Sequence, residues 1–304
     1  MNSATKRFRL RDWPRVPKRQ RQAFVVLLLC IAFFFVSSGS VVALLVMDAR
    51  NTALQTVPAQ GAAPSGSMPA PESTLPEEES FPGGVLPRGE DVGEDYLNET
   101  VWLGDSNMVR MYLYELVPLE NYMAIEGLGI EGFAEEPCIT FEDDPKTYTI
   151  AEAVALVQPR RVVMTFGTNN ADGKFTTDEF IRLYGEAIAA LQQAAPDCDI
   201  IVNAIPPVGE VRAYPDVTMG TINAFNTALE AFCAEQHLAF LRSDEALKGT
   251  NRFARPEYVV EDGLHMSEAG LQQLMQYLCE HPLVTHRQSV VHSSAPRRSP
   301  PQFS

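Results

Sequence analysis

The sequence predicts an α/β domain in which a parallel sheet is covered by helices on both faces. Short apolar runs alternate with longer segments of helical periodicity across residues 99–283. Two of the helical segments begin with the spacing of a capping box, Thr149 with Glu152 and Thr176 with Glu179. Strands that alternate with helices are typical of parallel sheets, and sites in such folds gather at the carboxyl ends of the strands.

Each expected element follows from its local pattern. The predicted strands are Thr100–Leu103, Tyr122–Ile125, Arg161–Phe166, Asp199–Ile205 and Leu238–Leu241. The predicted helices are Met108–Val117, Ile150–Val157, Thr177–Ala195, Met219–Gln236 and Ser267–Glu280. A region of about 185 residues is long enough for a single domain with its own core. We therefore expect one domain, with bounds at residues 96–284.

The N-terminal part of the chain predicts a membrane anchor. Residues 23–47 are apolar and uncharged, and they exceed the roughly 20 residues that a membrane-spanning helix needs. Residues 1–22 carry eight Lys or Arg and one Asp, which predicts a cytoplasmic N-terminus. A cleaved signal peptide is the alternative, but its apolar core is typically about 7–15 residues and Met47-Asp48-Ala49 is a poor cleavage site. The prediction is an uncleaved, single-pass signal anchor in contact with the bilayer.

The remainder of the chain is then extracytoplasmic and acidic. Residues 23–304 carry a net charge of −22 and no basic stripe, which argues against nucleic acid as a partner. Residues 48–95 are rich in Pro, Gly, Ser and Glu and predict a disordered linker. Residues 285–304 are again polar and contain Pro, which predicts a flexible tail.

The first candidate site residue is Ser106. The apolar run Val101-Trp102-Leu103 ends in Gly104-Asp105-Ser106-Asn107. A strand that ends here would deliver the serine to the carboxyl edge of the sheet, at the start of the next helix. The N–H groups and dipole of that helix would then stabilise an oxyanion. Asp-Ser-Asn is also ordinary turn composition, so the interpretation needs partners elsewhere in the chain.

Two later stretches supply such partners. Gly167-Thr168-Asn169-Asn170 follows a buried strand pattern, and an asparagine amide at that edge can donate to a developing oxyanion, although the stretch could equally be a turn. Asp262 precedes His265 by three residues, which lets the carboxylate fix the imidazole tautomer. The other four histidines lack an acid at that spacing. His265 is the predicted general base, and a loop histidine that caps a helix is the alternative.

Taken in order, Gly104-Asp105-Ser106, Gly167-Thr168-Asn169 and Asp262-Gly263-Leu264-His265 resemble the motif blocks of the SGNH (GDSL) hydrolase family. The resemblance spans the whole predicted domain. It implies a three-layer α/β/α sandwich with a flavodoxin-like parallel sheet, preceded here by the transmembrane helix. It also implies ester hydrolysis without a metal or cofactor.

The resemblance also implies site roles. Ser106 would be the nucleophile, and Asp262 and His265 the acid and base. The oxyanion hole would be formed by the Ser106 and Gly129 N–H groups and the Asn169 amide, with Gly127 as the alternative glycine. The family commonly has Asp where this chain has Asn170, which puts the local support of Asn169 in question.

A competing motif is Gly127-Leu128-Gly129-Ile130-Glu131-Gly132, the literal G-x-G-x-x-G of a dinucleotide site. That site needs a helix to begin at the motif, whereas Pro137 and a lack of apolar periodicity predict a loop. The acids at residues 142–144 could bind a cation, but a solvated loop is the simpler interpretation, and no His or Cys spacing typical of zinc is present.

Taken together, these features predict a membrane-anchored extracytoplasmic serine esterase. Its substrate would be a carbohydrate of the cell envelope or surroundings that carries short acyl groups such as acetyl, which follows only from the predicted location. Alternatives are a lipid esterase, an acyltransferase on the same fold, or a binding module without catalysis.

Overall fold

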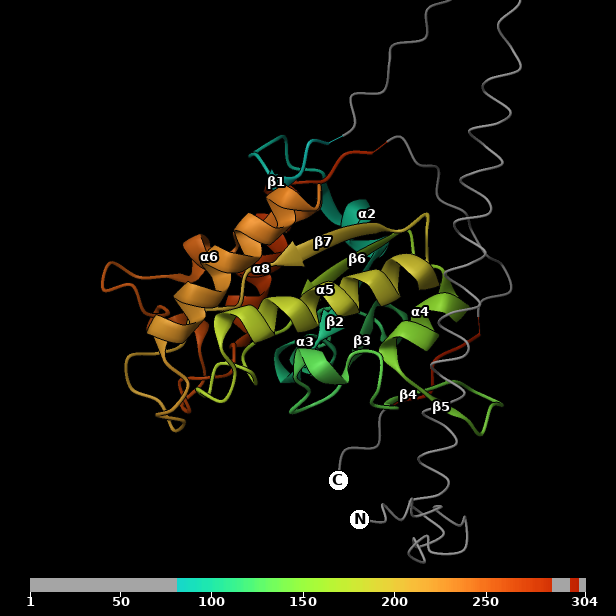
Figure 1. Ribbon diagram of the computed structural model, residues 1–304, viewed down its shortest axis with the longest axis horizontal. Helices are drawn as coiled ribbons and strands as arrows, with labels where there is room; N and C mark the ends of the chain where they lie inside the picture. The colour runs from blue at the N-terminus through green and yellow to red at the C-terminus, as the bar shows by residue number, and fades with distance from the viewer. Residues whose placement is uncertain (1–80, 286–295, 301–304) are drawn as a thin grey trace, which may run out of the picture. The chain divides into compact units, whose positions relative to one another are not determined.

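The computed structural model describes residues 81–285 and 296–300 (Figure 1). The predicted cytoplasmic segment at 1–22 and the predicted membrane span at 23–47 lie outside the described residues, as does most of the predicted linker. Within the described ranges, no helix is both long and apolar enough to cross a bilayer.

A six-stranded parallel sheet forms the centre of the domain, with the strand order β1-β8-β7-β6-β2-β3. Its strands are β1 (Gly84–Val85), β2 (Thr100–Gly104), β3 (Tyr122–Ala124), β6 (Arg161–Thr165), β7 (Asp199–Asn203) and β8 (Ala239–Leu241). The five predicted strands are all present, and β3-β2-β6-β7-β8 is the strand order of flavodoxin-like folds. The predicted fold class is confirmed.

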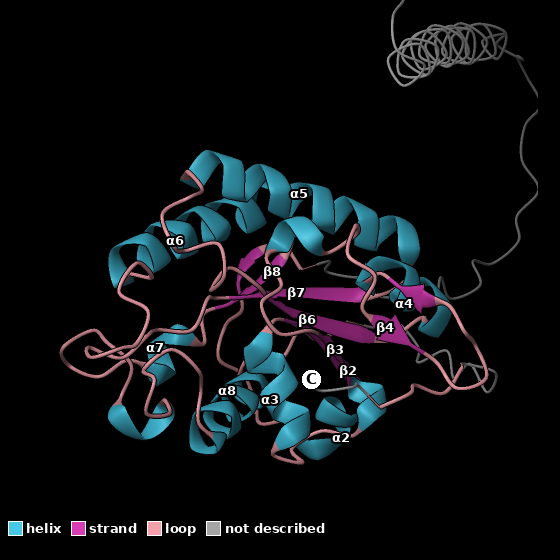
Figure 2. Ribbon diagram, turned by 90° about the horizontal axis from the view of Figure 1, so that it is seen from below, coloured by secondary structure: helices cyan, strands magenta, loops and turns pink. Residues whose placement is uncertain are grey.

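Helices cover both faces of the sheet and make the three layers seen in Figure 2. One face is covered by α4 (Ile150–Val157), α5 (Thr177–Ala194) and α6 (Met219–Glu235). The other is covered by α2 (Gly93–Asn98), α3 (Ser106–Leu113), α7 (Asp244–Leu247) and α8 (Glu268–Glu280). Smaller elements are the hairpin of β4 (Ile139–Thr140) and β5 (Thr147–Tyr148), and the 3-10 turns η1 (Leu119–Asn121), η2 (Ile130–Gly132) and η3 (Pro256–Tyr258).

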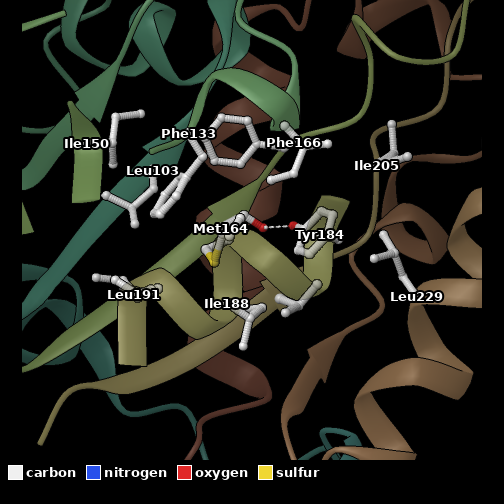
Figure 3. Close-up of a cluster of buried hydrophobic side chains, with 14 of the residues drawn as sticks. Leu103, Phe133, Ile150, Met164, Phe166, Tyr184, Ile188, Leu191, Ile205 and Leu229 are labelled. Carbon is white, nitrogen blue, oxygen red and sulfur yellow. Dashed lines mark hydrogen bonds between the residues drawn. The ribbon is translucent and has the colours of Figure 1, made fainter. Parts of the chain in front are cut away.

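Alternation along the strands divides the core between the two faces. Leu103 and Met164 point to the face covered by α5, whereas Trp102 and Val163 point to the face covered by α8. All four are completely buried. Figure 3 shows the α5 side, where the Tyr184 hydroxyl donates to the Met164 carbonyl oxygen at 3.4 Å. Apolar side chains on both faces of each strand explain why these strands appear in the sequence as unbroken apolar runs.

The helix predicted at Met108–Val117 begins two residues earlier and ends at Leu113. It begins earlier because the Asp105 side chain accepts a hydrogen bond from the Asn107 N–H at 3.0 Å and caps the helix. Ser106 is therefore the first helical residue. The two predicted capping boxes are both formed, at the starts of α4 and α5.

The folded domain begins before residue 96, inside the segment predicted as linker. Gly84–Val85 forms β1, and hydrogen bonds from the Gly84 N–H to Leu238 O (2.8 Å) and from the Leu86 N–H to Phe240 O (2.9 Å) attach it to the edge of the sheet. The Leu86 side chain is only 3% exposed. Composition alone could not place this boundary, because a two-residue strand is stabilised by the edge of β8 and not by its own pattern.

Part of the predicted flexible tail also packs on the domain. Arg298 is buried, and its Nη1 donates to the Tyr122 carbonyl oxygen at 2.7 Å. Arg298 also forms an isolated antiparallel bridge with Phe141. Residues 296–300 therefore cover the β3 edge of the sheet and the β4-β5 hairpin.

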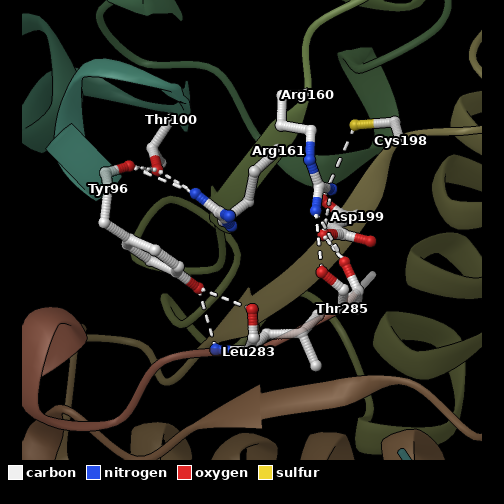
Figure 4. A network of polar contacts seen from close by, with 8 residues as sticks. All are labelled: Tyr96, Thr100, Arg160, Arg161, Cys198, Asp199, Leu283 and Thr285. Carbon is white, nitrogen blue, oxygen red and sulfur yellow. Dashed lines mark hydrogen bonds and ion pairs between the residues drawn. The ribbon is translucent and has the colours of Figure 1, made fainter. Parts of the chain in front are cut away.

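A polar network lies at the amino ends of the strands (Figure 4). The Tyr96 hydroxyl accepts from the Leu283 N–H at 2.8 Å, and the Arg161 guanidinium lies 3.4 Å from the Tyr96 ring centroid. The Thr285 hydroxyl donates to Asp199 Oδ2 at 2.7 Å. These contacts join α2 and the start of β7 to residues 283–285, on the side of the sheet opposite the carboxyl ends of the strands.

The burial of Leu86 gives a test of the revised boundary. Leu86→Ala should lower the free energy of unfolding by about 2–4 kcal/mol, because it removes a buried side chain and leaves a cavity. Leu156→Ala, at a position that is 43% exposed, is the matched control and should change it by less than about 0.5 kcal/mol. Urea unfolding of the purified chain measures both. Equal effects would place residues 81–95 outside the cooperative fold.

Candidate active site

Ser106 lies at the carboxyl edge of the sheet, where β2 passes directly into α3. Gly104 lets both α3 and the neighbouring strand β6 approach closely, because a Cβ at this position would overlap the Met108 side chain and lie 2.6 Å from the Thr165 carbonyl oxygen. Ser106 is buried, with 8% of its surface exposed. As the first residue of α3, it lies where the helix dipole favours negative charge.

The structure brings His265 and Asp262 to this serine. His265 Nε2 lies 2.9 Å from Ser106 Oγ, and His265 Nδ1 lies 2.6 Å from Asp262 Oδ2. Asp262 Oδ1 accepts the backbone N–H groups of Leu264 (2.8 Å) and His265 (2.9 Å). The three predicted residues therefore form one continuous chain of hydrogen bonds, although Ser106 and His265 are 159 positions apart.

A glycine shapes the turn that carries this pair. Gly263 has φ +66°, and a Cβ there would lie 2.1 Å from the Val211 carbonyl oxygen. The loop between β7 and α6 packs against the turn, with the Gly209 N–H donating to Gly263 O (2.7 Å) and the Ala213 N–H to Asp262 O (2.8 Å). The backbone of the Asp262 turn is thus held from outside as well as by its own side chain.

The hydrogen bonds around Asp262 also determine the imidazole tautomer. Burial acts to raise the pKa of Asp262, but the hydrogen bonds from His265 and Leu264 outweigh it, so this pKa lies below its ordinary value. An ionised carboxylate can only accept, so Nδ1 of His265 carries a hydrogen. Nε2 of a neutral ring then has a free lone pair, which faces Ser106 Oγ. This is the arrangement that a general base requires.

Asn107 fixes the distance between the two halves of the site, a role that sequence reasoning missed. Its Oδ1 accepts the Met266 backbone N–H at 2.8 Å, and the residue is fully buried. Asn107 and Met266 each adjoin one partner of the Ser106–His265 contact, so this bond holds the two backbones in register. The signal in the sequence was only its position beside the serine, which does not indicate the far partner.

Asn169 contacts the residues that precede the other two predicted oxyanion donors. Its Nδ2 donates to the Leu128 carbonyl oxygen at 3.1 Å and lies 3.4 Å from Asp105 Oδ2. Leu128 precedes Gly129 in the chain, and Asp105 precedes Ser106. The amide therefore contacts the residue that precedes each of the two backbone N–H groups with which it was predicted to act.

The two candidate glycines differ in burial and in the contacts of their neighbours. Gly129 is buried, whereas Gly127 is exposed and lies in a turn with φ +76°. Gly129 stands between Leu128, which contacts Asn169, and Ile130, whose N–H donates to Asn170 Oδ1 at 3.0 Å. The G-x-G-x-x-G stretch forms only the 3-10 turn η2, so the α-helix that a dinucleotide site needs is not formed there.

Asp105 is a buried acid between α3 and Asn169. It is 1% exposed, and burial raises its pKa to about 6, although the hydrogen bond from the Asn107 N–H acts in the opposite direction. Its carboxylate caps α3 and accepts from Asn169 at the same time. The cap could be predicted from an acid directly before a helix, but the second contact depends on the tertiary fold.

The raised pKa of Asp105 predicts a pH-dependent cost to stability. A pKa that is higher in the folded than in the unfolded protein means that folding is favoured at low pH and loses this contribution as pH rises through about 6. Asp105→Asn does not ionise, so its stability relative to wild type should rise by about 2 kcal/mol between about pH 4 and about pH 7. Urea unfolding at several pH values measures this difference. A constant difference across that range would contradict the assignment.

A sequence model described as the GDSL-like lipase/acylhydrolase family matches residues 120–273. Among solved structures, the chain is similar to a GDSL-like lipase from Bacteroides thetaiotaomicron, at 18% identity and a TM-score of 0.44 over 59% of this chain and 84% of that one. No curated protein matches the chain.

Two further solved structures are similar at the same level. One is the lipase/acylhydrolase from Enterococcus faecalis, with 18% identity and a TM-score of 0.43 over 59% of this chain and 93% of that one. The other is a carbohydrate esterase family 3 protein from Talaromyces cellulolyticus, with 17% identity and a TM-score of 0.42 over the same shares.

The family match covers just over half of the chain and includes Asn169, Asp262 and His265. The predicted family is thereby confirmed, although the Gly104-Asp105-Ser106 block lies before the matched residues. The chain belongs to the GDSL-like lipase/acylhydrolase family and is a hydrolase of carboxylic ester bonds.

Proposed function

We propose that this protein is an extracytoplasmic serine esterase, anchored by residues 23–47, that removes short acyl groups such as acetyl from carbohydrate. The observation that carries the catalytic part is the unbroken hydrogen-bond chain from Asp262 through His265 to Ser106. Such a chain is what the activation of a serine hydroxyl requires.

In the first half of the reaction, Ser106 Oγ attacks the carbonyl carbon of the ester while His265 Nε2 takes its proton. Asp262 stays ionised and stabilises the imidazolium that forms. The new C–O bond converts the carbonyl oxygen to an oxyanion. His265 then gives its proton to the leaving alcohol as the ester C–O bond breaks, which leaves an acyl group on Ser106.

The oxyanion would be held by three donors: the Ser106 N–H, the Gly129 N–H and the Asn169 amide. In the described part of the chain, neither backbone N–H donates to another protein group. Both backbone donors are therefore available without breaking an existing bond, which is the preorganisation that such catalysis needs. The Asn169 amide already contacts Leu128 O and Asp105 Oδ2, and it would exchange one of these contacts for the oxyanion. Water, deprotonated by His265, attacks the acyl group in the second half and releases Ser106.

The substrate class is supported by the predicted location. Membership of a lipase/acylhydrolase family accounts for the ester bond but does not fix the alcohol that carries the acyl group. An exported hydrolase on a tether of acidic and Pro-rich composition would meet the glycans of the cell envelope and surroundings. Acetylated saccharide is accordingly the substrate that we propose, with no nucleic acid or cofactor involved.

Hydrolysis assays on the purified chain test the chemistry and substrate together. Wild type should release acetate from an aryl acetate and from acetylated saccharides, whereas Ser106→Ala and His265→Ala should lower kcat by about 10³-fold or more. Ser267→Ala, which alters a helix cap beyond the hydrogen-bond chain, is the control and should retain most activity. A wild type that neither hydrolyses esters nor reacts with a serine-directed phosphonate would exclude the catalytic proposal. Preference for long-chain lipid esters, or transfer of the acyl group to an alcohol, would exclude the substrate proposal.

The proposed anchor and orientation have a separate test. If residues 23–47 span the membrane with the N-terminus in the cytoplasm, the chain should sediment with membranes and resist extraction by high salt. Protease should be added to cells whose outer layers are permeable but whose cytoplasmic membrane is intact. It should then remove a C-terminal epitope tag, while an N-terminal tag is protected. Protection of the C-terminal tag, or release by salt alone, would overturn this part of the proposal.

A further inference from the structure

Asn170 stands where the resembling family commonly has Asp, and the structure shows what this residue contacts. It is fully buried. Its Oδ1 accepts the Ile130 N–H at 3.0 Å, and its Nδ2 donates to Glu131 Oε2 at 2.7 Å. Since a backbone N–H can only donate, the atom facing Ile130 must be the amide oxygen. The amide nitrogen then has to face Glu131, so the two contacts determine each other.

This pairing explains why an amide occupies the position. An aspartate there could still accept the Ile130 N–H, but it would place a second carboxylate against that of Glu131, where neither has a hydrogen to donate. Two ionised carboxylates at hydrogen-bond distance repel each other strongly. The amide both accepts and donates, and so it can join a backbone N–H to an acid. In this chain the carboxylate at this contact therefore belongs to Glu131 in the loop and not to residue 170.

Glu131 also lies against the glycine of the predicted oxyanion hole. A Cβ built on Gly129 would overlap the carboxylate, with Glu131 Cδ only 2.7 Å away. The carboxylate is therefore folded back over the Gly129 backbone, on the same turn whose Gly132 N–H donates to Gly129 O at 3.1 Å. Glu131 is exposed, so a solvent-facing side chain is held in this position by a buried one.

We propose that Glu131 is a positioning residue of the esterase site, which acts through Asn170 to hold the Gly129–Ile130 peptide in place. The inference rests on the proposed function, because it assigns the Gly129 N–H to the oxyanion. Asn170 follows Asn169 in the chain, so the contacts of these two residues hold the loop that carries the Gly129 N–H next to the segment that carries the Asn169 amide. Since the oxyanion forms only during the reaction, loss of this support should lower kcat and leave KM nearly unchanged.

A charge exchange between the two residues tests the proposal. Asn170→Asp should lower kcat by about 100-fold, the order expected when one oxyanion donor is misplaced, with KM within about 3-fold of wild type. Glu131→Gln should stay within about 3-fold of wild type in kcat, because the glutamine oxygen still accepts from Asn170. The double variant Asn170→Asp with Glu131→Gln should recover to within about 10-fold, because the amide introduced at position 131 can donate to the new carboxylate.

Several controls make the result decisive. Glu135→Gln removes an exposed acid from the same loop and should leave both constants unchanged. Unfolding curves of every variant report folding separately from activity. If Asn170→Asp does not fold, Glu131→Ala takes its place, since it removes the acceptor without adding charge and should lower kcat by about 10-fold with KM retained.

The outcomes distinguish a failure of the role assigned to Glu131 from a failure of the proposed esterase function. Wild-type kcat in a folded Asn170→Asp, or a folded double variant no more active than Asn170→Asp, would overturn the role of Glu131 while Ser106→Ala still abolished activity. An inactive wild type would overturn the proposed function and this inference with it. Recovery in the double variant, with KM steady throughout, is the result that we expect.

Discussion

The hydrogen bond from the Met266 N–H to Asn107 Oδ1 is the contact on which the geometry of the site depends. Ser106 and His265 are 159 positions apart in the chain, and their own contact joins two side chains that can rotate. The Asn107–Met266 bond instead joins a buried side chain to the backbone, one residue beyond each partner. Because both groups are buried, breaking it would leave a polar atom without a partner away from water.

Amide side chains hold the carboxyl edge of the sheet together. Asn107 reaches the loop of His265, Asn169 reaches the Leu128 carbonyl, and Asn170 reaches the Ile130 N–H. An uncharged amide can link a donor to an acceptor without the cost of burying a charge. Asp105, in contrast, is a buried acid whose raised pKa reflects that cost. Its position between the start of α3 and Asn169 indicates that stability is given up here for the orientation of a donor.

Much of the fold follows from local patterns in the sequence. The central strands are apolar on both faces, which is why their positions could be predicted within a few residues. The capping boxes at Thr149 and Thr176 fix the starts of α4 and α5 through contacts three residues apart, so they too could be predicted. Four site residues could be predicted because each lies in a short motif and the motifs occur in the order typical of the family: Ser106, Asn169, Asp262 and His265. The distances between them could not be predicted from the sequence.

The features that could not be predicted depend on contacts between distant parts of the chain. β1 exists because β8 offers an open edge, and nothing in Gly84–Val85 alone predicts a strand. The burial of Arg298 against Tyr122 occurs in a stretch whose composition predicted a loose tail. The contact between Asn170 and Glu131 crosses 39 positions, so the significance of an asparagine at residue 170 cannot be judged from its neighbours.

The attachment of the chain at β1 has a mechanical consequence. Residue 81 and Thr285 both lie toward the amino ends of the strands, whereas Ser106 lies at the carboxyl edge. Tension on the chain from its N-terminal side would be borne first by the backbone hydrogen bonds that join β1 to β8. The loops that carry Gly129, Asn169 and His265 lie outside that load path. The domain could therefore be pulled from its N-terminal side without force reaching the reacting groups directly.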